Sequence, residues 1–177
     1  MQVKSIPLAR GLKNIYLDKT QASFIDGTTG KLLYRGYSIH ELAEKSTFEE
    51  TAFLLLYGHL PTKSELSDFD WILRHNRALP REVIDIIRQV HKGHPMDVLR
   101  TAVSALAAFD PETADNSREA TLRKGIRLTA QFPTIVATHH RIRRGESPIP
   151  PDTKLSHAAN FLYMLSGKEP SEEDAKL

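Results

Sequence analysis

The sequence has 177 residues, of which 40% are hydrophobic and 26% are charged, the balance of a globular protein rather than a disordered one. Its net charge of +2 gives no overall field that would attract nucleic acid or anionic lipid. The absence of cysteine excludes disulfides, thiolate metal sites and cysteine nucleophiles, and it fits a reducing compartment.

The N-terminal residues give no sign of a targeting segment. Residues 1–10, MQVKSIPLAR, lack the apolar core of a signal peptide. The apolar run at residues 53–57 is far too short to span a bilayer. We therefore expect a cytoplasmic protein with no membrane partner.

The first predicted element is a β-hairpin at about 22–36. Two short β-prone runs flank the turn sequence DGTTG at residues 26–30. Gly27 and Gly30 stand too close together for a phosphate-binding loop, and a second strand follows them instead of a helix. The glycines are therefore interpreted as turn residues.

The rest of the chain, about 38–177, is predicted to be helical, so the expected fold class is mainly α. Capping residues or prolines mark the helix starts, and two of them carry a capping box with threonine three residues before glutamate. Apolar residues recur at helical spacing after each start, which indicates one core-facing side per helix. The predicted starts are Ser38, Thr47, Thr62, Pro80, His94, Asn116 or Ser117, and Ser156.

Two of these helices differ in how apolar they are. The helix after Thr47, FEETAFLLLYG, is apolar on almost every face, so we expect it to be deeply buried and to end at Gly58. The helix after Pro80 carries a single apolar stripe, typical of packing on one side. That stripe comprises Val83, Ile86, Ile87 and Val90.

The stretch GHPMDVLRTAVSALAAFD, residues 93–110, begins with a histidine that either is catalytic or starts a helix. The residue before a proline favours extended geometry, proline suits the first helical position, and Asp97 suits the positive first turn. We interpret His94 as the start of a helix over 95–109, with a neutral imidazole accepting a backbone N–H. Small residues on this helix, which allow another helix to approach closely, are Ser104, Ala105, Ala107 and Ala108.

The longest predicted helix runs from residue 116 or 117 to about Arg144. Its apolar face continues past Pro133, so we expect a kink there rather than an end. The residues that keep this face throughout are Leu128, Phe132, Ile135, His139 and Ile142.

The C-terminal part is predicted to hold a linker and one more full helix. Residues 145–154, GESPIPPDTK, have the composition of a linker. The helix after Ser156 should end at Gly167, and residues 170–173 are typical of a further helix start. The apolar stripe of the full helix is Ala158, Phe161, Leu162 and Leu165.

Clusters of titratable residues indicate no reactive centre. His139 and His140 are adjacent, so on a helix they point about 100° apart and cannot share one metal ion. His91 and His94 are separated by residues that break a helix. The three arginines in 141–144 are interpreted as complementing the helix dipole, because no nucleic-acid motif accompanies them. The residues alone assign no catalytic, cofactor-binding or metal-ligating side chain and no nucleic-acid partner.

Four segments resemble the citrate synthase family, in the family's order and spacing. The resemblance extends from about Arg10 to Leu177, and the short hairpin is similar to that of the bacterial and archaeal type. The segments are Ile25-Asp26-Gly27, YRGYSIHELAEKSTFEETAFLLLYGHLPTKSEL (34–66), HPMDVLRTAVSALAAFD (94–110) and LSHAANFLYMLSGKEPS (155–171).

The resemblance implies a mostly helical homodimer whose subunits have a large and a small domain. It implies the condensation of acetyl-CoA with oxaloacetate, followed by thioester hydrolysis to citrate and CoA, at the entry to the tricarboxylic acid cycle. In that mechanism an aspartate removes a proton from the acetyl methyl group while a histidine stabilises the enol. A second histidine polarises the oxaloacetate carbonyl, and arginines hold its carboxylates. No metal or prosthetic cofactor is implied.

The chain departs from the family in its length. The resemblance places the family's catalytic histidines, aspartate and substrate-binding arginines after the last residue of this sequence, so none of these roles is carried onto a residue here. We expect residues 1–177 to be the N-terminal part of the large domain, without the rest of that domain or the small domain. Such a chain should be inactive by itself.

Two classes of function remain open at this point. One is the N-terminal portion of a citrate synthase-type acyltransferase, and because 2-methylcitrate synthases share these motifs, propionyl-CoA is an alternative substrate. The other is a non-catalytic helical dimerisation module derived from the same fold. In both cases we expect a homodimer through helices 96–109 and 117–144, with Ala105 in the contact, because the family uses the matching helices there.

Overall fold

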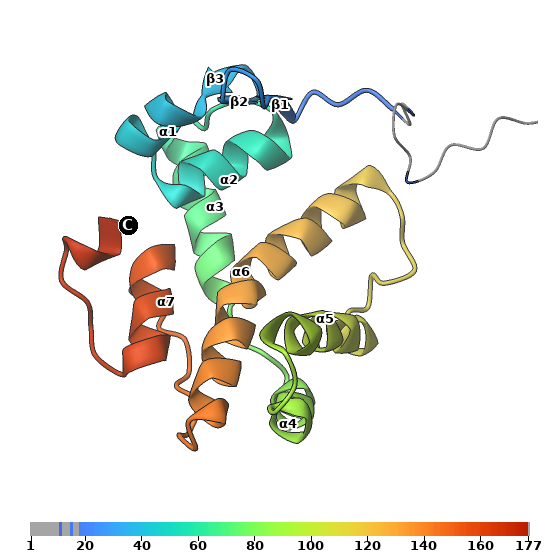
Figure 1. Cartoon of the computed structure of the whole chain (residues 1–177), viewed down its shortest axis with the longest axis vertical. Coiled ribbons are helices and arrows are strands. Elements are labelled where there is room, and N and C mark those ends of the chain that lie inside the picture. The colour runs from blue at the N-terminus through green and yellow to red at the C-terminus, as the bar shows by residue number, and fades with distance from the viewer. Residues whose placement is uncertain (1–10, 12–14, 16–17, 177) are drawn as a thin grey trace, which may run out of the picture.

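The structure is a computed structural model that describes residues 11, 15 and 18–176. The first ten residues, for which the sequence predicts no signal peptide, lie outside the described residues. In the described part a three-stranded sheet precedes seven α-helices, which confirms the mainly α prediction (Figure 1). The elements are β1 (Ser23–Asp26), β2 (Lys31–Tyr34), β3 (Tyr37–Ser38), α1 (Ile39–Lys45), α2 (Phe48–Tyr57), α3 (Lys63–His75), α4 (Arg81–Val90), α5 (Pro95–Leu106), α6 (Arg118–Arg143) and α7 (His157–Ser166), with 3-10 turns η2 (Ala107–Phe109) and η3 (Asp174–Lys176).

The predicted hairpin is confirmed and is part of a slightly larger sheet. β1 and β2 pair antiparallel, with Ser23 opposite Tyr34 and Asp26 opposite Lys31. The Asp26 carboxylate orders the turn between them by accepting the Thr28 amide at 2.9 Å. Hydrogen bonds to Thr29 and Thr28 also lower the pKa of Asp26.

A third strand, which the sequence did not predict, changes the start of α1. The chain turns back after β2 through Arg35 and Gly36, which have φ values of 50° and 93°. Ser38 then pairs with Leu33 as the last residue of β3. Ser38 occupies the expected position before α1, but its side chain makes no capping hydrogen bond.

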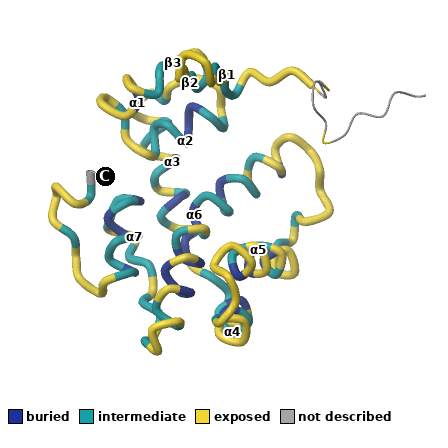
Figure 2. Tube along the Cα trace, viewed as in Figure 1, coloured by how far each residue is buried: buried dark blue, intermediate teal, exposed yellow. Residues whose placement is uncertain are grey.

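The long helix α6 is the centre of the fold (Figure 1). It contacts α3, α4, α5 and α7, and the buried stretches in Figure 2 gather where these helices meet it. Two apolar cores therefore share α6, one with α4 and α5 and the other with α2 and α3. Their buried residues are Val83, Ile87, Val98, Ala102, Leu106 and Ile135 in the first, and Phe53, Phe69, Leu73, Ile126 and Ala130 in the second.

The proline in α6 bends the helix without ending it, as predicted. Ser117 caps the helix by accepting the Ala120 amide at 3.2 Å, and helical structure continues through Pro133 to Arg143. Proline has no amide hydrogen for the carbonyl four residues earlier, which weakens the helix locally. The two halves of α6 accordingly run in different directions in Figure 1.

The expectation that α2 is deeply buried is wrong. Phe53 and Leu54 are buried, but Phe48 and Tyr57 at the two ends are 49% and 38% exposed. The predicted local signals are nevertheless present, because Thr47 and Glu50 form a capping box and Gly58 ends the helix at a φ of 93°. α2 packs against α3 and α7 and, through Phe53 and Leu56, against α6, while Phe48 and Tyr57 stay exposed at its two ends.

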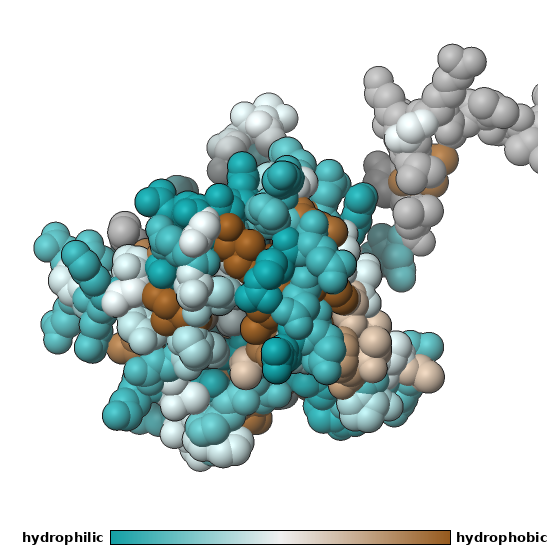
Figure 3. Space-filling model, turned by 90° about the horizontal axis from the view of Figure 1, so that it is seen from below, coloured by the Kyte–Doolittle hydropathy of each residue, from teal (hydrophilic) through white to brown (hydrophobic). Residues whose placement is uncertain are grey.

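Apolar side chains also reach the surface elsewhere. The face shown in Figure 3 carries separate apolar patches between hydrophilic residues. None of the helices in the described residues is long and apolar enough to cross a membrane.

Candidate functional site

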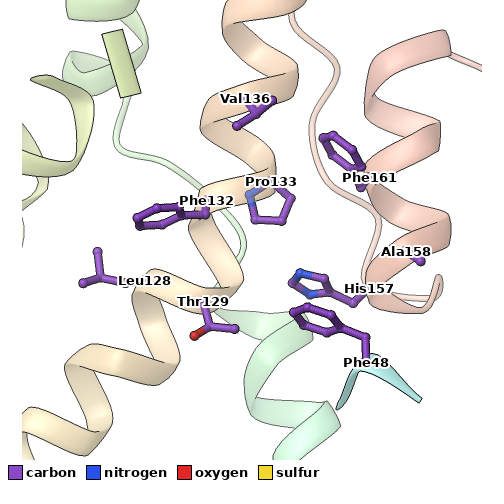
Figure 4. A pocket seen from close by; sticks show the side chains of 9 residues that line it. All are labelled: Phe48, Leu128, Thr129, Phe132, Pro133, Val136, His157, Ala158 and Phe161. Atoms are coloured by element: carbon purple, nitrogen blue, oxygen red, sulfur yellow. The ribbon is translucent and has the colours of Figure 1, made fainter. Parts of the chain in front are cut away.

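An open apolar groove of about 670 Å³ lies between α6 and α7, with the start of α2 at one end (Figure 4). Phe132 and Val136 of α6 are 38% and 40% exposed in it, and Phe161 points from α7 toward α6. The groove presents aromatic and aliphatic surface with a single histidine as its only titratable group, so it is suited to packing rather than to proton transfer. Its lining residues are Phe48, Leu128, Thr129, Phe132, Pro133, Val136, His157, Ala158 and Phe161.

His157, the first residue of α7, forms a wall of this groove. Its ring stacks on Phe48 with centroids 4.2 Å apart and planes within 6° (Figure 4). Its backbone N–H donates to Glu49 Oε1 at 2.9 Å. Burial, and then the charge of Arg77, lowers the pKa of His157 to about 4. The ring is therefore neutral at neutral pH and acts as a packing surface.

The face that α7 buries differs from the predicted stripe. Ser156 caps the helix by accepting the Ala159 amide at 3.3 Å and Gly167 ends it, as expected. The predicted stripe of α7 is only partly buried, because Ala158 and Phe161 of this stripe line the open groove. The fully buried residues are instead His157, Ala159, Asn160 and Met164. A histidine directly after a serine cap gives no sequence signal of burial.

The predicted linker at 145–154 is anchored to α3. Arg74 of α3 and Arg77 just after α3 hold the C-terminal half of the linker through backbone carbonyls. Arg77 Nη1 donates to the carbonyls of Asp152 at 2.7 Å and Leu155 at 2.9 Å. Arg74 Nη1 donates to the carbonyl of Lys154 at 2.6 Å. The segment is thus an ordered loop that fixes the start of α7, which its composition alone did not indicate.

His94 starts α5, as predicted. Its Nδ1 accepts the Met96 amide at 3.3 Å, Pro95 is the first helical residue, and Asp97 lies in the first turn. Because Nδ1 accepts an N–H, it carries no proton in this arrangement. The α-helix ends at Leu106, and a 3-10 turn over 107–109 completes the predicted helical span.

The small residues of α5 divide into two groups. Ala105, which we expected in a dimer contact, is half-buried against the core of its own chain. Ser104, Ala107 and Ala108 are exposed. Among these small residues, those free to meet another helix are therefore Ser104 of α5 and Ala107 and Ala108 of the 3-10 turn that follows it, rather than Ala105.

An ion-pair network fixes the connection between α5 and α6. Arg127 donates to Asp110 Oδ2 at 2.7 Å and to Glu112 Oε2 at 2.8 Å, and Arg123 also binds Glu112. Hydrogen bonds from Arg123 and Arg127 lower the pKa of Glu112 to about 2. These contacts hold the loop after α5 against the first half of α6.

Comparison with known proteins identifies the fold. The family model described as "Citrate synthase, C-terminal domain" matches residues 11–177. The chain belongs to the citrate synthase family. It is 46% identical over 171 residues to the citrate synthase of Deinococcus radiodurans, a match that covers 96% of this chain and 45% of that protein.

Other citrate synthase relatives give the same result. The chain resembles the crystal structure of citrate synthase from Pyrobaculum aerophilum with a TM-score of 0.91 and 39% identity, covering 99% of this chain and 46% of that one. It is 41% identical over 164 residues to a 2-methylcitrate synthase of Mycobacterium tuberculosis, covering 92% of this chain and 41% of that protein. The chain thus spans less than half the length of these relatives.

Citrate synthase membership agrees with the motifs from which the sequence predicted it. Three of the four motif segments coincide with structural units: the hairpin turn, α5 with its His94 start, and α7 with its Ser156 cap. The fourth covers α1 and α2 and ends within α3. Within the described residues, no three His, Asp or Glu side chains are grouped so that they could hold a metal ion.

Proposed function

We propose that residues 1–177 form the N-terminal part of the large domain of a citrate synthase. The complete enzyme would condense acetyl-CoA with oxaloacetate and water to give citrate and CoA. The observation that carries this proposal is the match to citrate synthases in sequence and fold over nearly the whole chain. The N-terminal placement rests on the order of the motifs, after which the resemblance expects a histidine-rich segment that contacts substrate.

In this proposal the chain supplies scaffold and subunit contacts rather than reacting groups. The groove between α6 and α7 would receive the remaining part of the large domain. Its exposed aromatic and aliphatic residues, together with the exposed Phe48 and Tyr57 at the ends of α2, support this role because apolar surface of this kind is normally covered in the native protein. The same surface should make the chain prone to aggregate when it stands alone.

The proposed dimer uses the opposite side of the molecule. The exposed small residues Ser104 of α5 and Ala107 and Ala108 of η2 support close approach of a second copy. α6 would complete the interface through exposed residues of its first turns, such as Arg118, Glu119 and Thr121. Contact between these helices and the same helices of a second subunit fits the two-fold symmetry of most homodimers.

The absence of cysteine supports a cytoplasmic location.

A chimeric enzyme tests the proposed function. The chain would be joined to the remaining C-terminal part of the Deinococcus radiodurans citrate synthase, and CoA release from acetyl-CoA and oxaloacetate would be measured. We expect activity from the chimera and none from residues 1–177 alone. Activity of the isolated chain, or a folded chimera without activity, would contradict the proposal.

The same chimera addresses the acyl-CoA substrate and the non-catalytic alternative. The identity with a 2-methylcitrate synthase favours propionyl-CoA as the second candidate substrate, so both thioesters would be compared at equal concentration. A stable dimer of residues 1–177 that does not bind the apolar dye ANS, together with an inactive chimera, would favour the dimerisation module.

A further inference from the structure

Arg77, which follows α3, is a buried charge with only part of its guanidinium in hydrogen bonds. The residue is 1% exposed. Nη1 donates to two loop carbonyls, those of Asp152 and Leu155. Nε and Nη2 are buried and have no hydrogen-bond partner among the described residues. Because arginine stays charged and buried polar groups are nearly always bonded, these N–H groups require an acceptor.

Two more buried atoms lack partners beside Arg77. They are Asp70 Oδ1 and His157 Nδ1. With the two nitrogens of Arg77, they make up four of the six unpartnered buried side-chain atoms found in the described residues. Losing a partner for a buried polar atom costs more than an average hydrogen bond contributes, so such a concentration at three residues is not expected from random packing.

Hydrogen bonds bring the three residues to one junction, because Arg77 binds the carbonyl of Leu155, two residues before His157, and Arg74 links Asp70 to the carbonyl of Lys154. Asp70 Oδ2 accepts Arg74 Nε at 2.7 Å, which leaves Oδ1 facing elsewhere. Burial and Arg77 lower the pKa of His157, whereas Glu49 and Asp70 oppose that effect. Burial and Arg74 likewise lower the pKa of Arg77, against the pull of Asp70, Glu49 and Asp152. The pKa values of Arg77 and His157 thus depend on the same two carboxylates, Asp70 and Glu49, at the junction of α2, α3 and α7.

The charges around the junction decide which ligand fits. Arg74 and Arg77 are balanced by Asp70 and Glu49, so a free anion would meet two carboxylates and a cation would meet two guanidinium groups. Arg77 offers donors, Asp70 Oδ1 is an acceptor, and the neutral ring of His157 offers one nitrogen. Water both donates and accepts, and buried water typically bridges about three such groups.

We propose that Arg77, Asp70 and His157 form an internal site that binds ordered water where α2, α3 and α7 meet. The water accepts from Arg77 Nε or Nη2 and donates to Asp70 Oδ1 and to His157 Nδ1. It thereby links the residue after α3 to the first residue of α7. Because the same histidine ring stacks on Phe48 and lines the groove, the site also fixes one wall of the groove from behind. This inference does not depend on the proposed enzyme activity.

Water itself is the probe in a test by NMR on the dilute, ¹⁵N-labelled 177-residue chain. The Nε–H signal of Arg77 is assigned from its loss in Arg77→Lys, and its cross-relaxation with water is measured. We expect a cross-peak with the sign of water that stays bound for longer than the molecule tumbles. Arg81, whose side chain is 92% exposed, is the internal control and should show only fast exchange.

Two results on the native chain would overturn the proposal. A protected Arg77 Nε–H without contact to water would indicate a direct ion pair with a carboxylate. A rapidly exchanging or missing Nε–H signal would show that the site is open to bulk solvent.

Matched variants identify the groups that hold the water. His157→Phe keeps an aromatic ring against Phe48 but removes Nδ1, and Asp70→Leu removes the acceptor. Each should weaken the cross-peak at least twofold in chains whose helical circular dichroism is unchanged, whereas Asp85→Asn on the exposed side of α4 should not. An unchanged cross-peak in folded Asp70→Leu would show that Asp70 is not part of the site. If Asp70→Leu fails to fold, the result from the native chain decides.

Discussion

The two sides of α6 differ in how they are closed. Toward α4 and α5, the helix buries a continuous apolar core in which Val83, Ile87 and Ala102 have no exposed surface. Toward α7, it packs on that helix but also borders an open groove, and arginines and Glu49 hold the loop before α7 and its first residue. The closed side is built from three consecutive helices. The open side depends on contacts between residues about 75 to 108 positions apart.

This difference shows that the α4 and α5 side of α6 has a closed apolar core, whereas the α7 side leaves an apolar groove open. The apolar faces of α4, α5 and α6 cover one another, as is common for helices that follow each other in the chain. The groove side combines exposed aromatic surface with a network of buried polar groups. We infer that the groove side is where further polypeptide packs, and four predictions test or sharpen the contrast.

The largest expected effect is the difference in unfolding free energy between alanine substitutions at two adjacent residues of α6. Ile135→Ala removes buried side-chain volume from the closed core and should lower the free energy of unfolding by about 2–5 kcal/mol. Val136→Ala removes one less carbon from an exposed groove position and should cost less than about 1 kcal/mol. Both changes replace a β-branched residue by alanine at neighbouring helix positions, so helix propensity largely cancels. Urea unfolding of the two dilute chains measures the difference, and equal costs would refute the contrast.

Acid should destabilise the groove side through His157. Its pKa is about 4 in the folded chain and 6.5 in its ordinary state, so the unfolded chain binds the proton first as the pH falls. The lowered pKa of His157 contributes on the order of 2–4 kcal/mol to the free energy of unfolding. This contribution is fully present above about pH 6.5 and is lost progressively as the pH falls to about 4. His157→Phe keeps the aromatic ring without this titration.

The measurement is urea unfolding of the native chain and of His157→Phe at several pH values between 6.5 and 4. The variant should lose less stability across this window. Glu112, whose lowered pKa makes the folded state lose stability as the pH falls below its ordinary 4.5, contributes equally to both chains. Identical pH slopes for the two chains would show that His157 is not buried as a neutral ring.

Self-association should depend on the outer surface of the closed side. Ser104→Trp places a large ring on the exposed face of α5 and should weaken the proposed dimer by about 1–3 kcal/mol through overpacking. Gln89→Trp, at an exposed position of α4, is the matched control. Sedimentation velocity over a range of concentrations measures the effect. A chimera that stays equally dimeric with Ser104→Trp would place the dimer contact elsewhere.

The smallest expected effect is at the start of α5. His94→Ala removes the acceptor for the Met96 amide and should cost about 0.5–1 kcal/mol, the low end for a lost cap, because the bond is long and exposed. His94→Asn keeps an acceptor and should cost less. Thermal unfolding separates the two, and the chimera should keep its kcat with either residue. A loss of kcat by orders of magnitude at an unchanged melting temperature would make His94 catalytic.

The features that the sequence predicted correctly depend on interactions between groups that lie within four residues of each other. The capping boxes at Thr47 and Thr62, the cap at Ser117 and the His-Pro step at 94 all bond groups two or three positions away. The glycine that ends α2 likewise follows from its own positive φ. Such interactions are largely independent of the rest of the molecule, so helix starts and ends are readable from the sequence.

The features that the sequence missed depend on which elements meet. Nothing in RHNRAL indicates that Arg77 is buried, because its partners are carbonyls 75 and 78 residues away. The apolar composition of α2 predicted deep burial, but burial depends on how many neighbours the fold supplies. The composition of 145–154 predicted a linker, whereas two arginines of another element hold it in place.

The sequence by itself therefore determined the mainly α class, the helix boundaries, the role of His94 at the start of α5 and, through its motifs, the citrate synthase family. The tertiary structure alone decided which helix faces are closed, where the apolar groove lies, and which buried polar groups meet behind His157. The physical reason is the distance along the chain over which each kind of interaction acts. Caps and periodicity act within one or two helical turns, whereas burial and the pairing of buried charges are fixed only when distant segments come into contact.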